Sequence, residues 1–256
     1  MMFTKNTLLQ NFTESLKEML TLHQSFDQWI EEVGVKLTDE QFNKFSQYLQ
    51  LLKAKNEGLN LTRITDMQDA WIKHILDSLM SAPFFQKPGL QVIDIGTGGG
   101  LPGIPLAILF PSAQFTLVDA TEKKMVAVQE FVHQLNLKNV TCLTSRIENL
   151  GRMTAHREQY DLVLSRALAP LRVLVELATP LFHPYGSLIA YKGPEYISEL
   201  LVSQNAIQAL RAESPRVFHY NLPEDKGQRT LIQVTKKTVT DQKYPRRDGI
   251  PGAKPL

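Results

Sequence analysis

The amino-acid sequence predicts an α/β fold in which helices cover both faces of a seven-stranded, mostly parallel sheet. Two observations lead to this prediction: short β-rich segments alternate with helical ones from residue 91 onward, and a buried strand runs directly into a glycine-rich turn at 92–105. Strands that alternate with helices form βαβ units, whose strands lie parallel. Residues 1–88 are expected to form a small helical cap, 89–240 the sheet domain, and 241–256 an extended, basic tail rich in proline and glycine.

Hydrophobic spacing predicts the helices of the cap. Apolar residues at i, i+3 and i+4 predict one helix around 16–23 and another through 42–52, with Thr38 as the N-cap of the second. A third helix is expected at 66–80. The segment 83–89, with two prolines and a glycine, is expected to connect the cap to the sheet domain.

The sheet domain is expected to contain seven strands. The first five are 91–95, 114–119, 139–144, 160–165 and 186–192. Helices are expected at 103–110, 122–135, 171–182 and near 194–212. No helix fits between the last two strands, 216–222 and 229–236, which should therefore form an antiparallel hairpin.

Chain length and composition narrow the class of protein. The 256 residues suit one large domain, or one domain with a smaller appendage, and 43% hydrophobic residues can support a full core. The single cysteine, Cys142, excludes an internal disulfide and fits a reducing compartment. Neither a secretory signal nor an apolar stretch of membrane-spanning length is seen, so we expect a cytoplasmic protein without a membrane partner. The net charge of +2 permits a nucleic-acid partner without arguing for one.

The glycine-rich turn offers two readings of its ligand. Gly98, Gly100 and Gly103 fit the G-x-G-x-x-G spacing of a dinucleotide site. With Asp94 and Gly96 added, the pattern D-x-G-x-G-x-G ends at Gly100. Asp94, at the carboxyl end of the strand, would repel a pyrophosphate but suits a cationic ligand. The turn therefore predicts a cradle for a cation-bearing nucleoside such as S-adenosylmethionine, with a purely structural glycine turn as the alternative.

Two further strand ends offer contacts for such a ligand. Asp119 ends the second strand and could accept hydrogen bonds from both ribose hydroxyls, although NAD would be held in the same way. Alternatively, Asp119 could serve only as the N-cap of the following helix. After the third strand, Ile147 could lie on an adenine ring and Glu148 could accept from its amino group, unless Glu148 is simply a solvated charge. These positions share the carboxyl edge of the sheet, where open α/β sheets bind ligands.

The fourth strand bears on the reaction. Ser165 and Arg166 stand at its carboxyl end, where amino-group methyltransferases usually carry an Asn/Asp-Pro-Pro-aromatic motif that is absent here. Pyrimidine-C5 enzymes need a nucleophilic cysteine, whereas Cys142 falls inside a strand predicted to be buried. An acceptor that is already nucleophilic, such as guanine N7, needs no general base and depends on in-line positioning. Arg166 is the candidate catalytic residue, with a structural ion pair as its alternative role.

A set of stretches covering nearly the whole chain from residue 57 matches one known family. The stretches are LNLTRI (59–64), HILDSL (74–79), VIDIGTGGGLPGIPLAI (92–108), LVDATEKK (117–124), SRIENL (145–150), LVLSRALAPL (162–171), YKGP (191–194) and YPRRDGIPGAKPL (244–256). They resemble the bacterial glucose-inhibited division protein B family, the small-subunit ribosomal RNA guanine-N7 methyltransferases G. The double-proline start of the helix after the glycines and the SRA motif are the most specific. Gly58 departs from the usual residue at its position.

The resemblance implies a class I S-adenosylmethionine-dependent methyltransferase that methylates N7 of a specific guanine in 16S rRNA by direct in-line displacement, without a metal. The expected cofactor contacts are Asp94, Gly96, Gly98, Gly100, Leu101, Asp119, Ala120, Thr121, Ile147, Glu148 and Arg166. The expected RNA contacts are Asn60, His74, Lys192, Arg246 and Arg247. The RNA is expected within the small ribosomal subunit or an assembly intermediate, and a monomer is favoured. A methyltransferase for a protein or small molecule, and more distantly a nucleotide-sensing regulator, are the alternatives.

Overall fold

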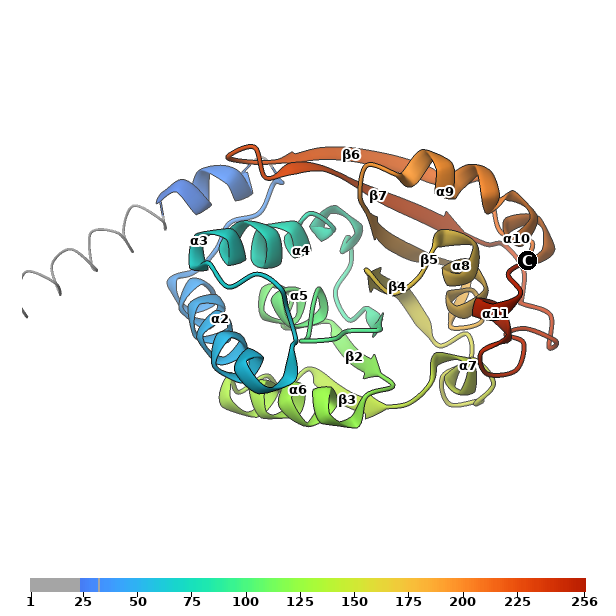
Figure 1. The fold of residues 1–256 in the computed structure, drawn as a ribbon, viewed down its shortest axis with the longest axis horizontal. Helices are drawn as coiled ribbons and strands as arrows, with labels where there is room; N and C mark the ends of the chain where they lie inside the picture. The colour runs from blue at the N-terminus through green and yellow to red at the C-terminus, as the bar shows by residue number, and fades with distance from the viewer. Residues whose placement is uncertain (1–23, 32) are drawn as a thin grey trace, which may run out of the picture.

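The computed structural model describes residues 24–31 and 33–256, and its centre is a seven-stranded sheet (Figure 1). The strand order is β3-β2-β1-β4-β5-β7-β6. The strands are β1 Gln91–Ile95, β2 Gln114–Asp119, β3 Val140–Thr144, β4 Tyr160–Arg166, β5 Phe182–Lys192, β6 Arg216–Leu222 and β7 Gly227–Thr235. Neighbours from β3 to β5 pair in parallel, while β7 pairs antiparallel with both β5 and β6. The predicted mostly parallel sheet with a C-terminal antiparallel hairpin is therefore confirmed.

Helices cover both faces of this sheet (Figure 1). The first face is covered by α2 Asp39–Leu59, α3 Met67–Ala70, the π-helical turn η1 Trp71–Leu76, α4 Asp77–Leu79, α5 Gly103–Leu109 and α6 Glu122–Gln134. The second face is covered by α7 Ile147–Leu150, α8 Leu171–Ala178, α9 Tyr196–Val202 and α10 Gln204–Ala209. Two separate hydrophobic clusters fill the space between the sheet and these layers. Burial of the helices' apolar faces is what holds the three layers together.

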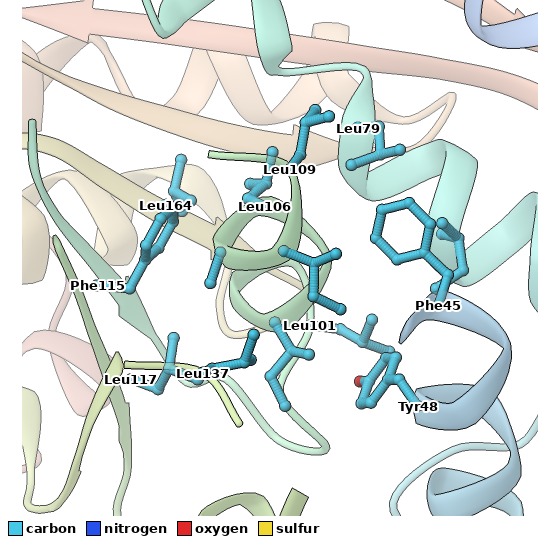
Figure 2. Packing of buried hydrophobic residues seen from close by; sticks show 14 of the residues in the cluster. Phe45, Tyr48, Leu79, Leu101, Leu106, Leu109, Phe115, Leu117, Leu137 and Leu164 are labelled. Carbon is cyan, nitrogen blue, oxygen red and sulfur yellow. The ribbon is translucent and has the colours of Figure 1, made fainter. Parts of the chain in front are cut away.

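The N-terminal helices share the first of these clusters with the sheet domain. Figure 2 shows Phe45 and Tyr48 of α2 and Leu79 of α4 in the same packed group as Leu106 and Leu109 of α5. All but Leu109 are less than 5% exposed. The helical layer therefore packs directly against α5, the helix that follows the glycine-rich turn. The domain boundaries at residues 88 and 240 stay predictions.

The start of α2 follows the predicted cap. The Thr38 side chain accepts a hydrogen bond from the backbone N–H of Gln41 at 3.2 Å, and the Gln41 side chain accepts one from the Thr38 N–H at 3.0 Å. This reciprocal pair satisfies two backbone donors that a helix start leaves free. At the other end, Asn60 takes a left-handed conformation with φ 49° and closes the helix. The helix expected around 16–23 lies mainly outside the described residues.

Several expected boundaries were wrong. The helix predicted at 66–80 is interrupted by the π-helical turn η1, and the one near 194–212 is divided at Ser203 into α9 and α10. The helix predicted at 171–182 ends at Ala178, and β5 begins at Phe182, earlier than expected. The strand that carries Cys142 is not buried: β3 lies at the edge of the sheet, so its residues are half-buried or exposed.

The tail was expected to be extended, and this was wrong as well. It folds back in turns and the short helix α11, Ile250–Ala253, against α8 (Figure 1). Arginine side chains of the sheet domain explain the difference. Arg157 donates to the carbonyls of Tyr244 and Thr240, each at 2.8 Å, and Arg152 donates to that of Pro245 at 2.8 Å. These donors replace the water that an extended, proline-rich segment would need for its carbonyls.

Candidate functional site

The turn between β1 and α5 is shaped as an open cradle. Gly96 and Gly98 have φ angles of 72° and 58°, in the left-handed region that glycine adopts without a steric penalty. A Cβ added at Gly98 would meet no described atom within 4 Å, so ligand atoms can approach this backbone closely. A Cβ at Gly96 would lie 2.5 Å from Cδ1 of Leu168, because the loop after β4 packs over the turn. The turn is thus fixed on one side and accessible on the other.

Asp94 supports this turn from below. Its Oδ2 accepts hydrogen bonds from the Thr97 hydroxyl at 2.6 Å and the Gly103 N–H at 2.9 Å. Its Oδ1 is buried and has no hydrogen-bond partner within the described part of the chain. Burial raises the pKa of Asp94 to about 6, although the two hydrogen bonds oppose that rise. The carboxylate therefore shapes the loop and places a negative charge beneath it, as a cationic ligand would require, without lining the hollow above.

Above the turn lies a hollow of about 280 Å³. Its walls are formed by Leu61, Thr62, His74, Gly96, Thr97, Gly98, Gly99, Leu101, Asp119, Lys124, Arg166, Ala167 and Leu168. Five of the expected cofactor contacts meet here: Gly96, Gly98, Leu101, Asp119 and Arg166. The parallel strands bring them together because their carboxyl ends share one edge of the sheet. We call this space the cofactor hollow.

Asp119 faces the cofactor hollow from the end of β2. Its Oδ2 accepts from the Gly98 N–H at 3.1 Å, and its Oδ1 accepts from the Thr121 N–H at 2.8 Å. The carboxylate thus braces the glycine-rich turn and the start of α6 together. Each oxygen keeps a second lone pair for a ligand hydroxyl. Ala120 and Thr121 follow as exposed residues at the start of α6.

Arg166 stands between two hollows. Its Nη1 donates to Oδ2 of Asp77 at 2.9 Å and to the carbonyl of Lys73 at 3.1 Å. Oδ1 of Asp77 accepts from the Tyr220 hydroxyl at 2.8 Å. The ion pair considered as the alternative role of Arg166 is therefore present, and the same side chain, which is 16% exposed, lines both hollows. Asp77 thus holds the guanidinium in one place at the boundary of the two hollows.

The second hollow, of about 590 Å³, shares Arg166, Ala167 and Leu168 with the cofactor hollow. Its other walls are Asp77, Ala169, Pro170, Tyr191, Lys192, Gly193, Glu199 and Arg229. Lys192 donates to Oε2 of Glu199 at 2.6 Å and to the Ala169 carbonyl at 2.8 Å. We call this space the acceptor hollow. Its volume lies within the range of small-molecule sites in proteins.

The structure places Ile147 and Glu148 outside the walls of the cofactor hollow. Ile147 is buried in the second hydrophobic cluster. Oε1 of Glu148 accepts from the Gly249 N–H of the tail at 2.9 Å and from Arg146 at 3.1 Å. Burial alone would raise the pKa of Glu148, but these donors hold it below its ordinary value. The adenine contacts of this pair stay predictions.

The expected RNA contacts are scattered rather than gathered. Asn60 is exposed at the end of α2. Nε2 of His74 lies 2.8 Å from the Thr62 hydroxyl, while its buried Nδ1 has no hydrogen-bond partner among the described residues. Burial lowers the pKa of His74 to about 3, so its ring is neutral at physiological pH. It lines the cofactor hollow as a neutral polar group and cannot serve there as a cation for phosphate.

The two neighbouring arginines of the tail have different surroundings. Arg246 is held by the fully buried carboxylate of Glu176, which accepts from its N–H at 2.9 Å, its Nε at 2.8 Å and its Nη2 at 2.6 Å. Arg247 is exposed. Of these two arginines, only Arg247 has no carboxylate partner among the described residues, and its contact with RNA stays a prediction.

Sequence reasoning missed residues that position the site. Asp77 lies in the HILDSL stretch, but nothing in its spacing marks it as the partner of Arg166. Tyr48 donates to the Gly99 carbonyl at 2.8 Å and so ties α2 to the glycine-rich turn. Leu168 completes the cofactor hollow, and Glu199 lines the acceptor hollow. These contacts join distant parts of the chain, for which a single sequence carries no periodic signal.

Two classes of feature are not found in the described part of the chain. No three or more His, Cys, Asp or Glu side chains of residues 24–31 and 33–256 gather where they could hold a metal ion. Among the helices described, none combines the length and the apolar character needed to cross a membrane.

Comparison with known proteins places this geometry in a family. The family described as "GidB: rRNA small subunit methyltransferase G" matches residues 41–231. The ribosomal RNA small subunit methyltransferase G of Carboxydothermus hydrogenoformans is 40% identical over 88% of this chain and 96% of its own. The protein of the same name from Leuconostoc citreum is 38% identical over 91% of this chain and 98% of its own.

Solved structures agree on the fold. A SAM-dependent methyltransferase from Aquifex aeolicus superposes with a TM-score of 0.51 at 18% identity, over 68% of this chain and 96% of its own. A SAM-dependent O-methyltransferase from Thermotoga maritima gives 0.51 at 14% identity, over 74% and 72%. These likenesses show a methyltransferase fold, and the sequence matches are far more specific. The chain belongs to the GidB family, the rRNA small subunit methyltransferases G.

Proposed function

We propose that this chain transfers a methyl group from S-adenosylmethionine to N7 of one guanine in the 16S rRNA of the small ribosomal subunit. The observation that carries the proposal is the shared wall between the cofactor hollow and the acceptor hollow, at Arg166. A methyl donor in one and a base in the other would meet there. The names of the relatives support the RNA substrate.

The cofactor hollow suits this donor. Asp119 offers acceptors for ribose hydroxyls, Gly98 offers an open backbone, and Asp94 adds negative charge below the loop. Bound S-adenosylmethionine supplies a methyl group on a positively charged sulfur, and its transfer leaves a neutral thioether and a positively charged 7-methylguanine. Guanine N7 carries a free lone pair, so no proton has to be removed.

The side chains around the hollows fit a reaction without a general base. His74 is a weak base, because burial lowers its pKa to about 3, and its ring is hydrogen-bonded to Thr62. In this proposal it shapes the wall of the cofactor hollow. Arg166 is held by Asp77 and lines the acceptor hollow. Its role in this proposal is to orient the base and the methyl donor relative to each other, which is where most of the rate enhancement arises in such reactions.

The RNA is proposed to be recognised as part of the small subunit or an assembly intermediate, in the cytoplasm. Exposed basic residues such as Arg247 would contact phosphates, which position an RNA without reading its sequence. The base itself would be an unpaired guanine turned out of its stack. RNA affinity should therefore fall as salt concentration rises.

Mapping the methylated atom tests the proposal. Small subunits from cells lacking this chain would be incubated with the purified protein and radiolabelled S-adenosylmethionine. Methylation at N7 labilises the base, so borohydride and aniline treatment should cut the 16S rRNA at one new position. A methyl group found on an exocyclic amine, a ribose or a pyrimidine carbon would refute the proposal.

A further inference from the structure

The acceptor hollow contains a carboxylate for which the proposed reaction has given no role. Glu199, on α9, lines the hollow with Lys192. Its Oε2 accepts from the Leu171 N–H at 2.6 Å and from Lys192 Nζ at 2.6 Å. Its Oε1 accepts no hydrogen bond from any residue that the structure describes, and the side chain is 27% exposed. Two donors thus hold the carboxylate by one oxygen and leave the other for a ligand.

We propose that Glu199 determines the base specificity of this enzyme by accepting hydrogen bonds from N1–H and the 2-amino group of guanine in the acceptor hollow. This inference rests on the proposed function. Guanine presents two adjacent donors on this edge. Adenine presents an unprotonated N1 instead and lacks the 2-amino group, so a carboxylate would face a lone pair. A fixed carboxylate therefore favours guanine through attraction and disfavours adenine through repulsion.

The position of Glu199 agrees with transfer to N7. The cofactor hollow meets the acceptor hollow at Arg166, Ala167 and Leu168, whereas Glu199 lines the acceptor hollow only. In guanine, N7 lies on the five-membered ring, away from N1 and the 2-amino group. A base held at Glu199 by that edge is therefore free to present N7 to the shared wall.

The charge of Glu199 suits the course of the reaction. Methylation at N7 makes the purine positively charged, and a fixed negative group at its edge interacts more strongly with the product-like state than with the neutral base. Glu199 should therefore affect turnover as well as binding. Lys192 acts as a positioning residue, since its ammonium group holds Oε2 of Glu199 and its side chain is only 9% exposed.

Arg229 gives the hollow a place for the nucleotide's phosphate. Its guanidinium lines the hollow and donates only to the backbone carbonyls of Gln228 and Lys226, at 2.9 and 3.5 Å, among the described residues. Its unused donors match a phosphate oxygen in charge and geometry. A phosphate contact at Arg229 would fix the nucleotide in place, while Glu199 would read its base.

The first experiment compares Glu199→Gln with Glu195→Gln, a control at an exposed carboxylate four residues earlier and outside the hollow. Methyl transfer to unmodified small subunits would be measured at saturating S-adenosylmethionine. We expect kcat/KM to fall about 10- to 100-fold in Glu199→Gln, with a lower kcat, as for the loss of a charge-assisted hydrogen bond. Glu195→Gln should match the unaltered enzyme, and S-adenosylhomocysteine affinity should be unchanged in both. Equal kcat/KM in the two variants would overturn the inference.

A change on the substrate side separates recognition from a structural effect of the variant. After the methylated position is mapped, small subunits are assembled with inosine there, which lacks only the 2-amino group. The kcat/KM of the unaltered enzyme should be roughly tenfold lower on inosine than on guanosine. The kcat/KM of Glu199→Gln should be the same on both substrates. If the loss caused by inosine is as large in Glu199→Gln as in the unaltered enzyme, Glu199 does not contact the base. A mapped product other than N7-methylguanine would instead refute the proposed function, so the two failures are distinguishable.

Discussion

The guanidinium of Arg166 lies 2.9 Å from the carboxylate of Asp77, a partner 89 residues away in the helical layer. The ion pair links the end of β4 to α4, and it does so at the wall between the two hollows. Asp77 also accepts a hydrogen bond from the hydroxyl of Tyr220 in β6, so β4, α4 and β6 meet at this point. The orientation of Arg166 thus depends on the whole arrangement of layers.

Arg166→Ala should lower kcat/KM for methyl transfer about 100-fold or more, because the side chain that orients the base and the methyl donor relative to each other is lost. It should also lower the free energy of unfolding by about 3 kcal/mol, since Asp77, whose side chain is 7% exposed, loses its counter-charge. Turnover and urea unfolding measure the two effects. Arg172→Ala, at an exposed arginine on α8, is the control. Normal turnover in folded Arg166→Ala would assign this residue to the ion pair alone.

Asp119→Ala should weaken S-adenosylhomocysteine binding by roughly 1–3 kcal/mol, the scale of lost hydrogen bonds to a charged acceptor. The Gly98 and Thr121 N–H groups would also lose their acceptor, so part of the loss would come from the turn itself. Titration calorimetry measures the affinity. The exposed Glu122→Ala serves as comparison. Unchanged affinity would leave Asp119 with only its role in bracing the turn.

Asp94 should make both stability and cofactor affinity depend on pH. Its pKa is raised by burial to about 6, above the ordinary value near 3.8. As pH rises from about 4 to about 6, the folded protein keeps a proton that the unfolded chain has released. The Asp94 contribution to the free energy of unfolding is therefore greatest below pH 4 and is lost through pH 6.

The cationic cofactor favours the ionised carboxylate, so its binding should release this proton below pH 6. S-adenosylmethionine should bind up to about tenfold more weakly at pH 5 than at pH 7.5, as linkage to one group with this pKa allows. S-adenosylhomocysteine, without the sulfonium charge, should show a smaller change. Calorimetry across this range measures both ligands. If Asp94→Asn keeps the same pH dependence, another group is responsible.

Arg246→Ala and Arg247→Ala should differ sharply although the residues are adjacent. Loss of the Arg246 side chain leaves the fully buried Glu176 without its counter-charge and should cost about 3–5 kcal/mol in the free energy of unfolding. Loss of the exposed Arg247 should change stability by no more than about 0.5 kcal/mol. If Arg247 contacts a phosphate, its removal should also reduce the slope of log RNA affinity against log salt concentration by about one. Equal stability of the two variants would contradict the ion pair.

Cys142→Ser should keep its turnover. The half-buried position of Cys142 raises the pKa of its thiol to about 11, so the thiol is protonated at neutral pH and a poor nucleophile. Direct transfer to N7 also predicts that no covalent adduct between enzyme and RNA accumulates. Denaturing electrophoresis with labelled RNA tests this. A trapped adduct that disappears in Cys142→Ser would point to a different reaction.

The sequence allowed the sheet to be predicted, and five of the predicted cofactor contacts line the cofactor hollow, although their binding role stays a prediction. Asp119 and Arg166 could be assigned to one edge because the ends of parallel strands must meet there. The partners of charged side chains could not be predicted, because nothing in the local pattern announces them. Glu148 bonds to the tail 101 residues away, and Glu176 to Arg246 70 residues away. Such pairs depend on how completed layers dock.

The docking of the tail has a consequence for synthesis on the ribosome. Glu176 is made long before Arg246, and the buried ammonium of Lys236 is bonded to Thr240 as well as to Glu158. Until residue 246 has left the exit tunnel, a nascent chain that packed α8 would bury a carboxylate without its counter-charge. The helical layer can dock earlier onto β1 to β3, because most residues of the first hydrophobic cluster precede residue 145. The second face should therefore mature last and remain the part most dependent on chaperones during translation.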